Sequence, residues 1–286
     1  IIGLDTSHSE VFTKLINQGG AEMLGYKVVA AYPHGSKDIE SALKMKPAIT
    51  KAVQELGVEI VDSIEKLLEK VDVVLLESND GRPHLEQALP VFKAGKRIFI
   101  DKPISATLAE TEAIFKAAAQ YNTPVFTSSA LRFDQNVQKV VDGGIGRVTG
   151  ADVYTPGTID KNHLDLAWYA IHGVEMLFTV MGSGCKQVTR TYTEGTDMVV
   201  GVWDDNRIGT VRAIRTGAAN IAGTAFGEKG IAALGPFSTY APLIKQIITF
   251  FETGKPPVTA EQTIEIFKFI DGAQKSKKKG GKAIKL

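Results

Sequence analysis

The tripeptide Asp101-Lys102-Pro103 places an ammonium group where α/β proteins hold their ligands. It follows an apolar run at residues 97–100, which predicts a buried strand. Open doubly wound sheets bind small molecules in the crevice beyond the carboxyl ends of their strands. Pro103 disfavours a helical conformation at the residue before it, so Lys102 is held at the strand end. A lysine there can move a proton or stabilise a developing alkoxide.

A second group with acid/base chemistry is His172, on a helix predicted over residues 166–181. Glu175 follows three residues later, so the two side chains share a helix face and the carboxylate can orient the imidazole. A hydroxyl releases hydride only when its proton leaves to a base within roughly 3 Å, while a cation stabilises the oxygen. We expect His172 to lie in one cleft with Lys102, and the residues leave open which of them is the base.

The elements that position Lys102 alternate regularly between strand and helix. This pattern predicts a Rossmann-type domain with a doubly wound parallel sheet over residues 1–127. The predicted strands are residues 1–4, 27–31, 59–61, 71–76, 97–100 and 124–127, and the predicted helices are residues 10–18, 48–56, 84–94 and 107–121.

The elements around His172 follow a different pattern. Long strands succeed one another without crossover helices, which predicts a second α+β domain at residues 128–286 with an open antiparallel sheet and helices on one face. The predicted strands are residues 148–154, 187–193, 197–203 and 208–215, and the predicted helices are residues 134–141, 166–181 and 259–274. We expect this domain to bind substrate and to form oligomers, and the terminal lysines 275, 277, 278, 279, 282 and 285 to be a solvated tail.

Composition narrows the class of ligand. The 286 residues suit two domains, and 33 basic against 32 acidic side chains leave a net charge of +1. Such a balance supplies no field to attract nucleic acid or an anionic membrane. The single cysteine, Cys185, excludes an internal disulfide and is expected to be a small buried residue. No apolar run is long enough to span a bilayer, so a cytoplasmic location is predicted, although the absent initiator methionine leaves an upstream segment open.

Residues 72–110 resemble the glucose-fructose oxidoreductase, inositol dehydrogenase and MocA-like (Gfo/Idh/MocA) family. That family has Glu-Lys-Pro where this chain has Asp101-Lys102-Pro103, and its Pro-x-x-His element corresponds here to Ser78-Asn79 followed by His84. Residues 171–182 resemble the helix on which the family places a histidine three residues before an acid. The resemblance covers nearly the whole chain.

The resemblance implies a two-domain oxidoreductase that passes hydride from a sugar or cyclitol hydroxyl to NADP or NAD, with Lys102 and His172 in proton transfer. The partner is then a small carbohydrate-like molecule, and the open sheet face implies a homodimer or homotetramer. The candidate cofactor residues are Gly3, Asp5, Thr6, Ser7, His8, Ser36, Ser78, Asn79, His84, Asp101 and Lys102. The candidate substrate residues are Arg132, His163, Asp165, Trp168 and Glu175.

The nucleotide loop departs from the family pattern. A dinucleotide fold uses Gly-x-Gly-x-x-Gly, and only Gly3 is retained, with Asp5 at the second glycine and His8 at the third. A carboxylate about 4 Å from a pyrophosphate charge costs roughly 1 to 4 kcal/mol. Hydroxyls and the helix N-terminus can offset this. After the second strand, Ser36 stands beside Lys37 where an acid usually binds ribose, which suits NADP at least as well as NAD.

Several alternatives stay open at this level. Trp168 replaces the family's acid four residues before His172, and it is either a stacking wall for a sugar ring or a core aromatic. Arg132, in an Arg-Phe pair that the family shares, either contacts substrate or forms a salt bridge between domains. His163, Asp165 and His172 are a minimal and unspecific set of metal ligands, so no metal is predicted.

Two alternative functions also remain. A protein that has lost dinucleotide exchange would use Lys102, His172, Asp5 and His8 for elimination or hydration of a carbohydrate. A non-catalytic relative would only bind a sugar.

Overall fold

The computed structural model describes residues 1–286, which form two compact units. Unit 1 comprises residues 1–105, 109–128 and 240–260, and unit 2 comprises residues 106–108, 129–239 and 261–286. We predicted a single boundary between residues 127 and 128. In the structure, the chain also returns to unit 1 at residues 240–260. That segment carries α9, Ala241–Thr253, whose Phe250 packs edge-on against Phe126 at a centroid distance of 4.9 Å.

Unit 1 is built on a parallel sheet of short strands. Its strands are β1 at Ala30–Ala31, β2 at Glu59–Ile60, β3 at Val74–Leu76, β4 at Ile98–Ile100 and β5 at Val125–Thr127. Ile2 forms parallel bridges to both Tyr32 and Leu76, so the chain start supplies the sixth position, between β1 and β3. The order β2-β1-Ile2-β3-β4-β5 is a doubly wound sheet, which confirms the predicted fold class.

Helices cover both faces of this sheet, as their apolar stripes require. They are α1 at Ser7–Gln18, α2 at Glu40–Glu55, α3 at Ile64–Leu68, α4 at His84–Lys93 and α5 at Leu108–Gln120, with a 3-10 turn, η1, at Gly20–Met23. Thr6 caps α1, its hydroxyl accepting a bond from the amide of His8 at 3.4 Å. The sequence did not predict α3 or α9.

Unit 2 contains a seven-stranded sheet in the order β11-β10-β6-β9-β8-β7-β12. The strands are β6 at Val148–Pro156, β7 at Cys185–Tyr192, β8 at Thr196–Trp203, β9 at Ile208–Ile214, β10 at Ala222–Gly227, β11 at Gly230–Leu234 and β12 at Ile284–Lys285. Five of its pairings are antiparallel as predicted, but β6 and β9 pair in parallel, so the sheet is mixed. The sequence analysis missed β10 and β11, whose glycine-rich segments lack a clear apolar alternation.

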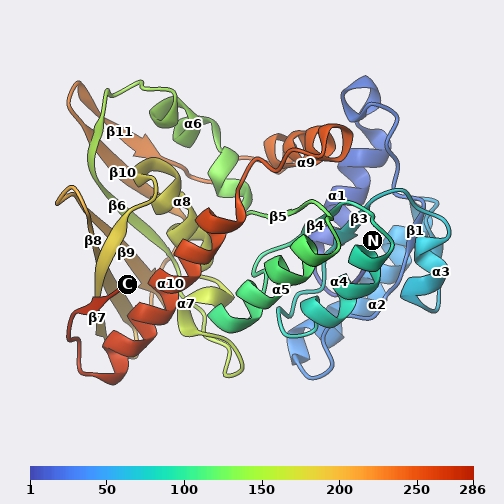
Figure 1. The fold of residues 1–286 in the computed structure, drawn as a ribbon, viewed down its shortest axis with the longest axis horizontal. Coiled ribbons are helices and arrows are strands. Elements are labelled where there is room, and N and C mark those ends of the chain that lie inside the picture. Colours follow the sequence, from blue (N-terminus) through green and yellow to red (C-terminus); the bar gives the residue numbers. More distant parts are fainter. The chain divides into compact units, whose positions relative to one another are not determined.

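The helices of unit 2 pack on one face of this sheet (Figure 1). They are α6 at Gln135–Val141, α7 at Asp165–Trp168, α8 at Ile171–Met181 and α10 at Ala260–Lys278, with a 3-10 turn, η2, at Ala130–Phe133. The helix predicted over residues 166–181 is interrupted at Tyr169, whose φ of −126° departs from helical geometry. Aromatic contacts of Phe178 with Trp203 and Phe269 hold α8 and α10 on the strands.

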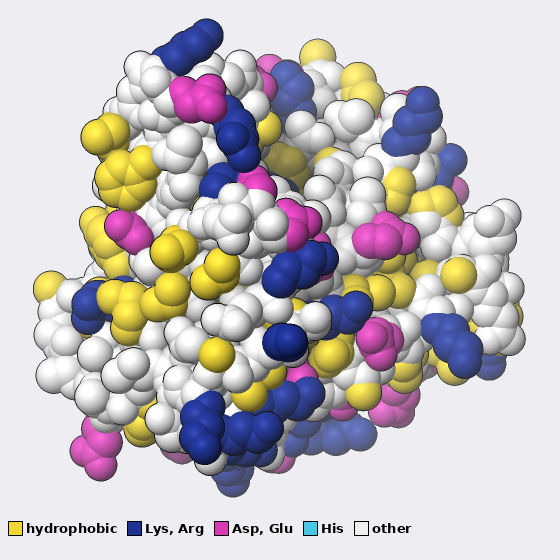
Figure 2. Space-filling model, turned by 60° about the vertical axis from the view of Figure 1, so that its left-hand side comes forward, with side chains coloured by type: hydrophobic (Ala, Val, Ile, Leu, Met, Phe, Trp, Pro, Cys, Tyr) yellow, Lys and Arg dark blue, Asp and Glu magenta, His cyan; other side chains and the backbone are white.

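Cys185 is buried in this core as predicted, and burial raises the pKa of its thiol to about 12. The opposite face of the sheet carries exposed apolar side chains, among them Tyr154, Ile208 and Ile231. Figure 2 shows hydrophobic patches on the side it presents, with Lys and Arg side chains gathered along its lower edge. No helix in the structure combines the length and apolarity needed to cross a bilayer.

Candidate active site

The segment after β4 lies at the carboxyl end of the parallel sheet. The amide of Asp101 donates to the carbonyl of Leu76 at 2.8 Å, so the strand pairing with β3 continues up to this residue. Lys102 follows directly, is 9% exposed, and precedes Pro103 through a cis peptide bond. The lysine therefore lies where parallel sheets expose their ligand-binding loops.

His8, on the first turn of α1, connects Asp101 to the surface of unit 1. Its Nδ1 lies 2.7 Å from Asp101 Oδ2, and its Nε2 lies 3.0 Å from the hydroxyl of Tyr240. The ring also stacks on Phe12 at 5.1 Å. Burial opposes ionisation of Asp101, but His8 and Lys102 together lower its pKa to about 2. Asp101 is thus an anion, held by a charge-assisted bond.

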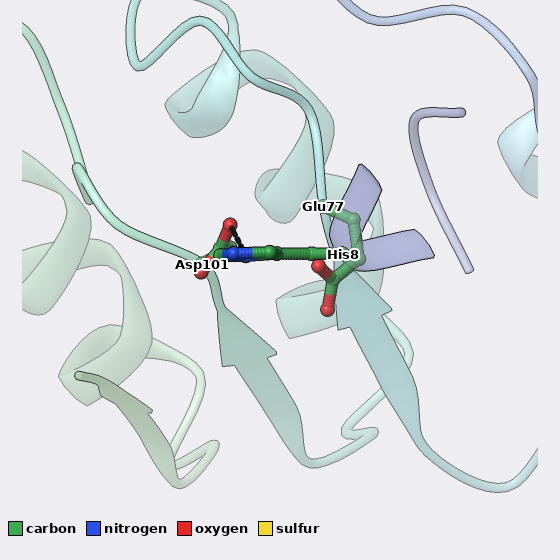
Figure 3. Close-up of side chains that lie close together, drawn as sticks. All are labelled: His8, Glu77 and Asp101. Carbon is green, nitrogen blue, oxygen red and sulfur yellow. Dashed lines mark hydrogen bonds and ion pairs between the residues drawn. The ribbon is translucent and has the colours of Figure 1, made fainter. Parts of the chain in front are cut away.

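Glu77, directly after β3, completes a buried cluster with these two residues (Figure 3). A ring nitrogen of His8 and one carboxyl oxygen each of Glu77 and Asp101 lie within 4.8 Å of one another. Both carboxylate oxygens of Glu77, and Oδ1 of Asp101, have no hydrogen-bond partner. Burial raises the pKa of Glu77 well above its usual value, and the neighbouring charge of Asp101 adds to this rise.

Hydrogen bonds from buried side chains hold the loop after β3 in place. His84 is fully buried, with Nε2 2.8 Å from the carbonyl of Ser78 and Nδ1 2.9 Å from that of Ile104. The Ser78 hydroxyl donates to Gln87 at 2.7 Å. Gly3 has φ +88°, and a Cβ there would lie 2.5 Å from Ser78 Oγ, so only glycine permits this approach. Gly3, Ser78 and His84, all candidate cofactor residues, therefore shape the loop through bonds within the protein.

Asp5 lies at the point where the strand order reverses. Its carboxylate is fully buried and accepts hydrogen bonds from the amide of Ser36 at 2.6 Å and from that of Asn79 at 3.0 Å. A Cβ on Gly35 would lie 2.4 Å from this carboxylate. The side chain thus joins the loop after β1 to the loop after β3. In a doubly wound sheet these two loops flank the ligand crevice.

In unit 2, His172 contacts Ser129, which was not among the predicted site residues. Its Nδ1 lies 2.6 Å from the hydroxyl of Ser129, whose amide donates to Glu175 Oε2 at 2.9 Å. Arg132 Nε lies 3.5 Å from the same Glu175 oxygen, and burial lowers the pKa of this guanidinium. The structure therefore brings His172, Glu175 and Arg132 together around Ser129, and the pairing of Arg132 with Glu175 inside unit 2 was not predicted.

The remaining candidate substrate residues have partners within unit 2. His163 Nδ1 lies 2.8 Å from Asp160 Oδ1, and its ring lies 4.7 Å from that of Trp168. Asp165 accepts bonds from Arg190 at 2.7 Å and Lys277 at 2.8 Å. Lys277 is therefore not part of the solvated tail that we predicted, because an inward-facing carboxylate binds it.

Residues 1–129 match the family model GFO_IDH_MocA, described as an oxidoreductase family with an NAD-binding Rossmann fold. The matched stretch contains Lys102 and every loop at the carboxyl edge of the parallel sheet. This part of the chain is similar to the Gfo/Idh/MocA family. The predicted nicotinamide cofactor is confirmed as the cofactor class of this fold.

A curated protein is similar to part of the chain. The myo-inositol 2-dehydrogenase of Thermotoga maritima is 28% identical over 196 residues, which are 64% of this chain and 55% of that protein. The chain thus matches about half the length of this curated relative.

Two solved structures show the same fold across nearly the whole chain. The scyllo-inositol dehydrogenase of Lactobacillus casei, with bound NAD(H) and scyllo-inositol, superimposes with a TM-score of 0.78 at 18% identity, covering 99% of this chain and 97% of that one. The myo-inositol dehydrogenase of the same organism, with NAD(H) and myo-inositol, gives 0.78 at 16% identity, covering 100% and 95%. At these identities the likeness shows the fold alone.

The carboxyl edge of the unit 1 sheet offers hydrogen-bond donors that suit a nicotinamide dinucleotide, and one side chain, Asp5, occupies two of them. The N-terminus of α1 and the amides of Ser36 and Asn79 are donors suited to phosphate and ribose oxygens. Asp5 occupies both of those amides with its own carboxylate. Thr6 and Ser7 add hydroxyl groups beside it, Thr6 buried and Ser7 exposed. The donor set fits the cofactor, and Asp5 must release the two amides before a ligand can use them.

Proposed function

We propose that this protein oxidises a hydroxyl group of a cyclitol or sugar with NAD or NADP, using Lys102 and His172 as its proton-transfer groups. The observation that carries the proposal is the position of Lys102 directly after β4, at the ligand edge of a parallel sheet in an oxidoreductase family. The cyclitol class is supported by the curated relative, a myo-inositol 2-dehydrogenase.

Lys102 is suited to stabilising the oxygen of the reacting alcohol. It is nearly buried, so an ammonium group acts there in a lower effective dielectric than in water, where charge stabilisation is stronger. In this assignment Lys102 holds the alkoxide that forms as the hydroxyl proton leaves.

His172 is suited to accepting that proton. Ser129 engages Nδ1 at 2.6 Å, so a ring that donates its Nδ1 hydrogen to Ser129 presents the lone pair of Nε2 as the base. Glu175 fixes Ser129 through the backbone amide, and Arg132 neutralises Glu175. The reverse assignment, with Lys102 as the base, predicts a different pH dependence and is distinguished by it.

The cofactor would be held by the donors of unit 1. The amides of Ser36 and Asn79 and the N-terminus of α1 would bind its phosphate and ribose oxygens. Ser36 and Lys37 also suit the 2′-phosphate of NADP. When bound, the nicotinamide supplies a hydride acceptor. The chain's own residues orient the alcohol and remove its proton.

The test is turnover of myo-inositol, scyllo-inositol and a panel of aldoses with NAD or NADP, followed by the absorbance of the reduced nicotinamide. Lys102→Met should lower kcat by about 10²- to 10⁴-fold, and Lys93→Met, an exposed lysine on α4, should not change it. Turnover that Lys102→Met leaves unchanged contradicts the proposal.

A second candidate function is elimination or hydration of a carbohydrate without nicotinamide. The occupation of the Ser36 and Asn79 amides by Asp5 favours it, because a dinucleotide would have to displace that carboxylate to use them. Turnover of a sugar acid in the complete absence of nicotinamide would identify this activity. Binding of a sugar without any turnover would instead indicate a non-catalytic relative.

We also propose that the exposed face of the unit 2 sheet pairs with a second copy of the chain. Tyr154 and Ile231 are 41% and 70% exposed on this sheet, and apolar side chains at such exposure are commonly covered by a partner. Light scattering should give a dimer or tetramer mass, reduced by the double variant Tyr154→Glu, Ile231→Glu. A monomeric mass for the wild type contradicts this.

A further inference from the structure

The cluster of His8, Glu77 and Asp101 contains three buried carboxyl oxygens that accept no hydrogen bond in the structure. Glu77 is fully buried with no partner for Oε1 or Oε2, and Asp101 has none for Oδ1, although His8 serves its Oδ2. A buried polar group without a partner costs about 1–3 kcal/mol, and more when it is charged. A proton or a cation held between the two neighbouring carboxyl groups would give these oxygens a partner.

The charges around Glu77 favour a proton over a second negative charge. Asp101 repels an ionised Glu77, and the charge of Lys102 opposes this effect only in part. Two carboxyl groups that share a dry site ionise one at a time.

We propose that Glu77 and Asp101 share one proton and form a buried acid pair, which His8 connects to Tyr240 at the edge of unit 1. One oxygen of each carboxyl group lies within 4.8 Å of the other, so a small approach of the Glu77 side chain would let its hydroxyl donate to Asp101. Asp101 Oδ2 already faces His8 Nδ1, and His8 Nε2 faces the Tyr240 hydroxyl. The four groups then form a continuous hydrogen-bonded path.

The position of the acid pair links it to the proposed oxidation, on which this part of the inference rests. Asp101 precedes Lys102 in the chain, so the charge state of the pair sets the field at the lysine. Oxidation of an alcohol to a ketone releases one proton together with the hydride. In the reverse assignment, with Lys102 as the base, the path from Asp101 through His8 to Tyr240 gives the released proton a route outward that does not pass through the substrate. Glu77 acts here through Asp101 and is a positioning residue.

The first test is infrared spectroscopy of the protein at pH 7 without nicotinamide or substrate. Ordinary carboxyl groups are ionised at this pH, so a protonated carboxyl stretch identifies a group with a raised pKa. The wild type should show one such band, which shifts in D₂O and is absent from Glu77→Gln. The matched control, Glu55→Gln on the exposed end of α2, should retain the band.

Two results would overturn the acid pair. Absence of the band in folded wild-type protein would mean that Glu77 is ionised. One equivalent of a divalent metal, found by elemental analysis of the wild type and lost in Glu77→Gln, would mean that a cation joins the carboxylates instead. Because no cofactor is added, either result is independent of whether the protein oxidises cyclitols.

The path to the surface has its own test. After transfer to D₂O, the band should shift more slowly in Tyr240→Phe than in the wild type, since that variant removes only the hydroxyl at His8 Nε2. Tyr26→Phe, which removes the hydroxyl bonded to Glu252, is the matched control and should exchange at the wild-type rate. Equal rates in all three proteins would exclude Tyr240 as the exit.

Discussion

Each unit of this protein buries a group of charged side chains, and the two groups differ in how completely they are paired. In unit 2, the side chain of Arg190 donates to Asp197 at 2.8 Å, Asp165 at 2.7 Å and Gln274 at 3.0 Å. Arg215 donates to the second oxygen of Asp197 at 2.6 Å. We call this set the ion network. The acid pair of Glu77 and Asp101 in unit 1 instead leaves three buried oxygens without partners.

This difference separates a stabilising role from a chemical one. A buried ion pair with complete hydrogen bonding is tied to one geometry and resists change in its protonation. Buried carboxyl groups that lack donors have displaced pKa values, and such groups are concentrated at functional sites. The ion network therefore holds unit 2 together, whereas the acid pair lies beside Lys102 and can exchange a proton.

Breaking the ion network should give the largest loss of stability. Arg190→Met removes the central cation and leaves Asp197 buried without its main partner, which costs about 3–5 kcal/mol of unfolding free energy. Chemical denaturation measures this loss. Arg147→Ala, an exposed partner of Asp205 in the same unit, should cost under about 1 kcal/mol. Equal losses of unfolding free energy in the two variants would mean that burial of the ion network adds nothing to stability.

Changing the acid pair should alter how stability depends on pH. The unfolded chain loses the Glu77 proton near the usual pKa of 4.5, whereas the folded protein retains it because burial raises that pKa. Folded wild type therefore holds one more proton above pH 4.5, and its stability should fall relative to Glu77→Gln by about 1.4 kcal/mol per pH unit up to the folded pKa. A difference that is constant between pH 5 and 8 would contradict protonated Glu77.

The smallest effect is expected at the edge of the ion network. Lys277 donates to Asp165 and lies 3.6 Å from the centre of the Tyr192 ring, with its side chain 26% exposed. Lys277→Met should cost about 1 kcal/mol, because a partly exposed ion pair and a cation–π contact are both modest. Lys279→Met, in the exposed turn that follows, should have no measurable effect in the same denaturation experiment.

The sequence predicted the elements whose periodicity is strong. Alternating strands and helices gave the parallel sheet of unit 1, and the strand-end position of Lys102 followed from Pro103 and the apolar run before it. The ion network was predictable but missed. Arg190 lies two residues after Val188 in β7 and Asp197 two residues before Val199 in β8, so both share the inward face of their strands and had to pair there. The parallel pairing of β6 with β9 has no such local signal.

The chemistry of the acid pair could not be read from spacing. Glu77 and Asp101 are 24 positions apart, and His8 is 93 positions from Asp101, so only the sheet order brings them together. Asp5 was recognised as a departure at the second glycine, but its bonds to Ser36 and Asn79 depend on two distant loops. Ser129 was missed because a lone serine after a strand has no distinctive pattern. Tertiary contacts, not local preferences, assign these side chains.

The most direct test of the account is a fluorescence titration of NADH and NADPH into the wild type, Asp5→Gly and Asp5→Asn. If unit 1 holds the nicotinamide and Asp5 competes for its donors, both variants should bind more tightly than the wild type. The gain for Asp5→Gly should reach about ten- to a thousandfold, the equivalent of roughly 1 to 4 kcal/mol. Failure of all three folded proteins to bind either nucleotide would contradict the assignment of this crevice to a nicotinamide cofactor.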